Sequence, residues 1–149
     1  MPIRDARPDD IDAICALITE LAEYEELSDQ VVFDAADMRR HLFESDPPAA
    51  RVLIAETSAP PPVVTGFALW VPTFSTFTAR PAIWLEDLFV RPEHRGQGFG
   101  RASLERLRTF TDDRIEWAVL DWNQPSIDFY RSLGARPLDG WTHYRWLPS

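Results

Sequence analysis

Apolar and polar positions alternate along this chain with spacings that predict its helices and strands. Asp9 or Asp10 can cap a first helix, because a carboxylate accepts hydrogen bonds from the free backbone N–H groups of the first turn. Apolar residues then recur three or four positions apart, and this stripe comprises Ile11, Ile14, Cys15, Ile18 and Leu21. A second helix is predicted over residues 34–43.

Strands are predicted where short apolar runs end at turn residues. The predicted strands cover residues 3–4, 51–57, 63–71, 83–90, 116–121 and 142–146. Prolines at positions 60–62 indicate an exposed hairpin turn, because proline cannot donate to a sheet ladder. Further helices are predicted over 99–110 and 125–133, the latter opened by Pro125. This order predicts one α/β (α+β) domain over residues 1–149, with a mixed sheet covered by helices.

The composition narrows the class of protein. Hydrophobic residues make up 45% of the 149 residues, but no apolar run reaches the roughly 20 residues of a membrane span. The N-terminus has no apolar segment typical of a secretory signal. Cys15 is the one cysteine, which excludes an internal disulfide and fits a core position in a cytoplasmic protein. His41, His94 and His143 lie far apart in the sequence, so no metal site is predicted.

Charge is distributed unevenly. The formal net charge is −9, lysine is absent, and residues 1–50 hold 13 acids against 4 arginines. Eight acids and no base lie between Asp9 and Asp29. This sign excludes nucleic acid as a partner. Two interpretations of the acidic stretch stay open: a solvated helix face, or an acidic rim that attracts cationic ligands.

A glycine-rich segment follows the predicted strand that ends at Val90. Gly96, Gly98 and Gly100 alternate at the start of a helix and are flanked by Arg95 and Arg101. Glycines let backbone N–H groups approach a ligand closely, and a helix N-terminus favours anions. The segment therefore predicts a pyrophosphate cradle, with a plain turn as the alternative. A P-loop would require a lysine, and a Rossmann fingerprint would require a different glycine spacing.

Two carboxylates, Glu86 and Asp87, interrupt the apolar strand 83–90. Strand alternation places them on opposite faces unless a bulge redirects one of them. Burying an unpaired carboxylate costs several kcal/mol, so the pair requires either a structural arginine partner or a chemical role.

The pattern Arg95-x-x-Gly98-x-Gly100 resembles the coenzyme A signature of the GNAT acetyltransferases. Residues 84–90 and 121–130 are similar to the spermidine/spermine (diamine) branch of that family, as are Glu23–Glu25 and Gly140–Trp141. The resemblance implies the GNAT fold, with a mixed, mostly antiparallel sheet flanked by helices. It also implies acetyl-CoA as co-substrate, no metal, a small-molecule amine substrate, no membrane partner and a homodimer as in many family members.

The resemblance also assigns roles to residues. It implies Glu86 as the base that deprotonates the amine and Tyr130 as the acid that protonates the leaving thiolate, with core packing as the alternative for Tyr130 beside Phe129. The implied cofactor contacts are Leu88, Phe89, Val90, Arg95, Gly96, Gln97, Gly98, Phe99, Gly100, Arg101, Asn123, Ser126, Tyr130 and Arg131. The implied substrate contacts are Glu25, Glu86, Asp87, Asp139 and Trp141.

The chain departs from the diamine branch in two places. Ser132 and Leu133 stand where those enzymes carry basic residues, and the segment 73–78 lacks an acid that they place there. The predicted function is transfer of an acetyl group to a primary amine of a small cationic substrate: a diamine, a polyamine or a thialysine-like amino acid. The alternatives are an acetyltransferase acting on an aminoglycoside or a protein N-terminus, a non-catalytic acetyl-CoA sensor, and a purely structural module.

Overall fold

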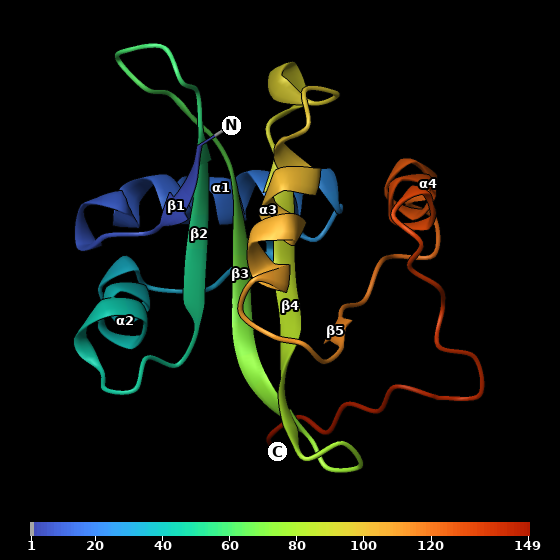
Figure 1. Ribbon diagram of the computed structural model, residues 1–149. Coiled ribbons are helices and arrows are strands. Elements are labelled where there is room, and N and C mark those ends of the chain that lie inside the picture. Colours follow the sequence, from blue (N-terminus) through green and yellow to red (C-terminus); the bar gives the residue numbers. More distant parts are fainter. Residues whose placement is uncertain (1) are drawn as a thin grey trace. The chain divides into compact units, whose positions relative to one another are not determined.

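One sheet organises the larger part of the computed structural model, which describes residues 2–149. In the described residues its strands, in spatial order, are β1 (Ile3–Asp5), β2 (Arg51–Glu56), β3 (Val64–Ser75), β4 (Arg80–Val90) and β5 (Ile115–Glu116). Neighbouring strands pair antiparallel except β4 and β5, which are parallel. The expectation of a mixed, mostly antiparallel sheet is therefore confirmed (Figure 1).

Helices are distributed over two compact units, Met1–Ala118 and Val119–Ser149. The first unit contains α1 (Ile11–Tyr24), α2 (Ala35–Arg39), α3 (Phe99–Arg108) and the short helices η1 (Pro8–Asp10), η2 (Ser28–Gln30), η3 (Arg40–Glu44) and η4 (Pro92–His94). The second unit contains α4 (Gln124–Ser132). The predicted helix 34–43 is present as α2 followed by η3, which has π geometry.

Both faces of the sheet in the first unit are covered by helices. Leu17 of α1 packs with Ile54 and Phe67 of the strands in one buried cluster. Leu53 and Ala68, which neighbour those strand positions, are also fully buried, and alternation directs them to the opposite face. Figure 1 shows α1 and α3 on opposite sides of the strands, which accounts for burial on both faces.

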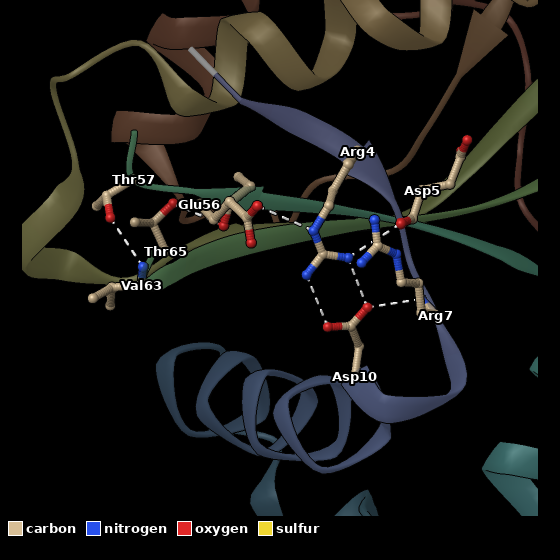
Figure 2. Close-up of polar contacts among 9 residues, drawn as sticks. Arg4, Asp5, Arg7, Asp10, Glu56, Thr57, Val63 and Thr65 are labelled. Atoms are coloured by element: carbon tan, nitrogen blue, oxygen red, sulfur yellow. Dashed lines mark hydrogen bonds and ion pairs between the residues drawn. The ribbon is translucent and has the colours of Figure 1, made fainter. Parts of the chain in front are cut away.

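Paired charges tie the N-terminal segment to β2. The guanidinium of Arg4 binds Asp10 at 2.8 Å (Nη1 to Oδ2) and 3.0 Å (Nη2 to Oδ1), and its Nε lies 3.1 Å from Oε1 of Glu56 (Figure 2). Asp10 also accepts a hydrogen bond from the backbone N–H of Arg7 at 2.7 Å. One arginine therefore joins β1, η1 and β2.

Close approach of β3 and β4 depends on a glycine. A Cβ atom added at Gly66 would collide with the backbone carbonyl oxygen of Phe89. Only a residue without a side chain fits here. Glycine at this position therefore allows β3 to approach β4 at the end of β4 that leads into the glycine-rich segment.

Two strand predictions fail in the C-terminal part. The predicted strand 116–121 is reduced to Ile115–Glu116, and the predicted strand 142–146 is wrong, because those residues form no ladder in the described structure. Residues 136–149 are exposed throughout. Aromatic and β-branched residues at 142–146 favour an extended chain, but a strand also needs a partner edge for its backbone groups.

Candidate active site

A bulge in β4 sets the direction of the two carboxylates that interrupt this strand. Leu69 of β3 pairs with Asp87, and the next residue, Trp70, pairs with Leu85, so Glu86 is an extra residue opposite no partner in β3. The bulge that sequence alternation required for a shared carboxylate site is therefore present. Bulges of this kind redirect a side chain and are frequent beside active sites.

Three predicted substrate contacts come together around this bulge. Burial, and to a smaller extent the neighbouring carboxylates of Glu86 and Glu25, raise the pKa of Asp87 to about 7. Burial also raises the pKa of Glu25, which caps the C-terminus of α1. Among the described residues none of the three forms an ion pair with an arginine. An arginine partner for Glu86 and Asp87, which the sequence had left open as an alternative, is therefore absent among residues 2–149.

The outer edge of β4 can accept an extended ligand. In the described sheet β5 pairs with β4 only at Ile83 and Trp84. The segment from Leu85 to Val90 therefore has no strand of the sheet on that side. Such an edge presents backbone N–H and C=O groups to a chain with amide groups, such as the pantetheine arm implied for Leu88, Phe89 and Val90.

The glycine-rich segment contains left-handed backbone and leads directly into α3. Gly96 and Gly98 have φ values of 76° and 95°, in the left-handed region that favours glycine. Gly98 is the N-cap of α3 and contributes no side-chain cap, so the free N–H groups of the first turn remain for a ligand. At Gly96 an added Cβ would meet no atom within 4 Å, which leaves open space beside the loop. These features fit the pyrophosphate of coenzyme A.

Arg95 does not extend freely from this segment. Its guanidinium carbon lies 4.7 Å from the ring centroid of Tyr24 and 5.4 Å from that of Phe89. Its Nε donates to the carbonyl oxygen of Val90 at 2.8 Å. The side chain thus braces the loop against α1 and β4 in this structure, whereas Arg101 is exposed.

In the second unit, α4 carries the predicted acid. Asn123 is the N-cap and its side-chain oxygen accepts from the backbone N–H of Ser126 at 3.4 Å. The rings of Phe129 and Tyr130 lie 5.4 Å apart and are tilted by 52°. Arg131 lies in the last turn of α4, where the helix dipole stabilises a positive charge.

The remaining predicted substrate contacts of this unit lie beyond α4. Asp139 and Trp141 are exposed and flank Gly140, whose φ is 87°. The roles assigned to the residues of this unit stay predictions.

Sequence reasoning missed two residues in the first unit. Trp84 donates its indole N–H to Oε2 of Glu86 at 2.7 Å, and Tyr24 forms the aromatic surface beneath Arg95. An aromatic residue two positions before a strand carboxylate is a signal that could have indicated Trp84, because residues i and i+2 share a strand face.

The strand predicted over residues 63–71 extends into the segment 73–78. β3 continues to Ser75, which is buried, and Thr78 donates to a carboxylate oxygen of Asp113 at 2.8 Å. The sequence segment lacks an acid, but the fold brings one from the connection between α3 and β5. Backbone and side-chain hydrogen bonds, from Arg114 N–H and from Thr78, lower the pKa of Asp113.

Residues 2–149 contain no group of three or more His, Cys, Asp or Glu side chains arranged to hold a metal. Within the same range no helix combines the length and apolar character that crossing a bilayer requires.

Known proteins with similar sequences are acyltransferases. Residues 16–135 match the model of the acetyltransferase (GNAT) family. A thialysine N-epsilon-acetyltransferase of Bos taurus is 39% identical, over 96% of this chain and 90% of the relative. An L-ornithine N5-acetyltransferase of Arabidopsis thaliana is 28% identical, over 93% of this chain and 81% of the relative.

Solved structures share the fold. An integron cassette protein from the mobile metagenome of V. cholerae has a TM-score of 0.75 at 23% identity, with 99% of this chain and 92% of that chain covered. At this identity the likeness concerns the fold alone.

Proposed function

The chain belongs to the GNAT family of acetyltransferases, and we propose that it acetylates a primary amine of a small substrate that carries a second cationic group. The protein is an enzyme, and acetyltransferases of this family use acetyl-CoA as co-substrate. The observation that carries the proposed substrate is the group formed by Glu25, Glu86 and Asp87, three neighbouring carboxylates without an arginine.

A cationic substrate explains why these carboxylates lie together. Burial of a carboxylate and like charges at close range are both unfavourable, and the raised pKa of Asp87 reflects first the burial and then the neighbouring charges. An ammonium group supplies the missing positive charge. We propose that Glu25 and Asp87 hold the second cation of the substrate, with Asp139 and Trp141 as further contacts.

We propose Glu86 as the base and Tyr130 as the acid. The ammonium of the substrate loses a proton to Glu86, directly or through water, because the protonated amine has no lone pair for attack. The thioester supplies an activated acetyl carbon; an N–C bond to it forms and the C–S bond breaks. The Tyr130 phenol donates its proton to the departing sulfur and regains one from the acetylated nitrogen, so the reaction releases one proton overall.

Cofactor contacts are proposed in both units. The edge of β4 at Leu88, Phe89 and Val90 is suited to the pantetheine arm, and the segment 95–101 to the pyrophosphate. Asn123, Ser126 and Arg131 are proposed to add contacts from α4 and its N-cap. We propose that residues 1–149 act as one catalytic domain, a view supported by a family match that extends over residues from both units.

Amino-acid side chains and short diamines are the preferred substrate classes. The two relatives described above are named for thialysine and ornithine, both of which carry a side-chain amine. We expect these amines and short diamines to react faster than long polyamines, because Thr73–Thr78 lacks the acid found in the polyamine enzymes.

The test is acetyl-CoA turnover against a panel of amines, with thiol release followed and products identified by mass. The panel contains thialysine, ornithine, short diamines, spermidine, an aminoglycoside, a peptide N-terminus and a monoamine matched in length. Selective acetylation of the dicationic amines supports the proposal. Binding of coenzyme A without turnover of any amine would instead indicate a sensor.

Two variants test the proposed roles. Glu86→Gln and Tyr130→Phe should each lower kcat by about 10²- to 10⁴-fold, the usual contribution of a positioned acid or base. Matched controls are Glu105→Gln and Tyr144→Phe, which alter exposed side chains.

A homodimer in the cytoplasm is the proposed form of the enzyme, supported by the habit of the family and by the lone Cys15. Light scattering of the purified chain and fractionation of expressing cells test these two points.

A further inference from the structure

We propose that Trp84 is a positioning residue, which orients the carboxylate of Glu86 for proton transfer through its indole N–H. This inference rests on the proposed role of Glu86 as base. The distance from Nε1 of Trp84 to Oε2 of Glu86 is 2.7 Å. A neutral donor bound to an ionised carboxylate makes a short and comparatively strong hydrogen bond.

The bulge creates the need for such a donor. Glu86 is the extra residue of β4 and lies opposite no residue of β3, so cross-strand neighbours do not fix its side chain. It is also exposed. A flexible glutamate adopts several rotamers, whereas proton transfer requires a carboxylate oxygen within hydrogen-bond reach of the amine or of one bridging water.

Trp84 is itself firmly held. Its backbone pairs with Val71 on one side and with Glu116 of β5 on the other, at the only part of β4 that has strand partners on both edges in the described sheet. The ring is half-buried. A rigid donor two residues before the bulge occupies Oε2 and leaves Oε1 for the substrate proton.

Substitution of the donor should lower turnover without changing cofactor binding. Trp84→Phe retains an aromatic ring and removes the N–H group. We expect kcat to fall about tenfold, the scale of one hydrogen bond to a charged group, with KM for acetyl-CoA unchanged.

A double-mutant cycle separates positioning from general damage. In the Glu86→Gln background, Trp84→Phe should change kcat by less than about twofold, because the carboxylate that it orients is already gone. Trp70→Phe removes the same volume from β3, where the ring stacks on Phe110 at 5.3 Å. This control should lower stability and leave kcat within about twofold, with an effect that adds to that of Glu86→Gln.

Indole resonances provide a readout that does not depend on activity. In ¹⁵N-labelled protein, one indole N–H signal should move when Glu86 is replaced by glutamine, while the other indole signals stay in place. The moving signal should be the one missing from the spectrum of Trp84→Phe.

The outcomes distinguish this inference from the function on which it rests. If Glu86→Gln leaves kcat unchanged, the assignment of the base is wrong and the inference fails with it. If Glu86→Gln lowers kcat but Trp84→Phe does not, or if the two losses are fully additive, the base stands and the positioning role is overturned. Unmoved indole signals in Glu86→Gln would overturn it as well.

Discussion

Two groups of carboxylates in the first unit have opposite surroundings. At β1, Asp10 and Glu56 share the guanidinium of Arg4, and the hydrogen bonds from Arg4 lower the pKa of Asp10 (Figure 2). At β4, burial and neighbouring acids raise the pKa of Asp87 to about 7. The same type of side chain is thus held ionised in one place and driven towards its neutral form in the other.

The difference indicates that the charges around Arg4 have a structural role and that those around Asp87 have a functional one. The Arg4 group contains its own counter-charge, since one guanidinium is shared by two carboxylates, and it connects three elements. The group of Glu25, Glu86 and Asp87 lacks its counter-charge and lies beside the glycine-rich segment and the open edge of β4. A perturbed, uncompensated carboxylate at such a place is typical of an active site. Changes in the first group should therefore alter stability and leave catalysis unchanged, whereas changes in the second group should alter catalysis as well.

The largest expected effect is on selection of a dication. Asp87→Asn should lower kcat/KM for a diamine by about 30-fold or more, because removing one partner of a desolvated charge pair costs about 2–5 kcal/mol. A monoamine of equal length should lose far less, since it lacks the second cation. Steady-state kinetics with both amines measure the ratio.

Glu105→Gln serves as the control, because this acid is exposed on α3. Equal losses for the diamine and the monoamine in Asp87→Asn would contradict a role for Asp87 in holding a second cation. The contrast between the two groups of carboxylates would then concern burial alone.

The second effect is a gain of stability in the Asp87→Asn variant above neutral pH. Because the folded state holds a proton on Asp87 up to about pH 7, the free energy of unfolding should fall as pH rises from about 4 to about 7 and then level off. Asp87→Asn removes the titrating carboxylate, so the free energy of unfolding of the variant should not fall in this way as pH rises. At pH 8 the variant should be more stable than the wild type by up to about 4 kcal/mol, at 1.36 kcal/mol per unit of pKa shift. Thermal unfolding at pH 4 and pH 8 should show the difference only at the higher pH.

The third effect is a loss of stability at β1. Arg4→Met leaves Asp10 and Glu56 without their partner and should destabilise the fold by about 1–2 kcal/mol, because these side chains are only partly buried. Asp10 has a lowered pKa when folded, so this contribution is present at neutral pH and is lost as acid protonates it. Arg80→Met, at an exposed position, is the control for urea unfolding. An unchanged kcat in Arg4→Met is part of the expectation.

Sequence patterns predicted the helices and strands that bury an apolar face. They did not predict correctly the strands whose extent depends on pairing with another strand. The hairpin around the prolines at 60–62 and the helix after Gly98 are present because turn and cap residues specify them locally. The strand 142–146 had suitable residues, but pairing is a property of two segments and cannot be read from one. For the same reason the sequence did not show that β3 extends to Ser75, where Arg80 is its partner.

Within the site, motif residues were easier to predict than contacts between distant segments. Left-handed backbone at Gly96 and Gly98 follows from residue type, and the bulge at Glu86 could be anticipated from two adjacent acids in an apolar strand. The position of Arg95 over Tyr24 joins residues 71 positions apart, which no local pattern encodes. The indole contact of Trp84 with Glu86 joins residues two positions apart, and strand alternation is the local pattern that could have indicated it.

The smallest expected effect concerns the acidic stretch from Asp9 to Asp29, and it tests whether that stretch belongs with the catalytic group or is only a solvated face. Exposed charges attract a dication over a distance comparable to the Debye length, about 10 Å at 0.1 M salt, so added salt should weaken this attraction. Raising the salt concentration from about 20 to about 500 mM should lower the ratio of diamine to monoamine kcat/KM by a few fold. A Glu23→Gln/Glu26→Gln variant, which neutralises two exposed acids near the end of α1, should reduce the salt effect, whereas the control Glu105→Gln/Asp112→Asn should keep it. The destabilisation caused by Arg4→Met should respond less to salt, because its partners lie in direct contact and are partly buried. A diamine-to-monoamine ratio independent of salt would assign the acidic stretch to solubility and leave substrate selection to Glu25, Glu86 and Asp87.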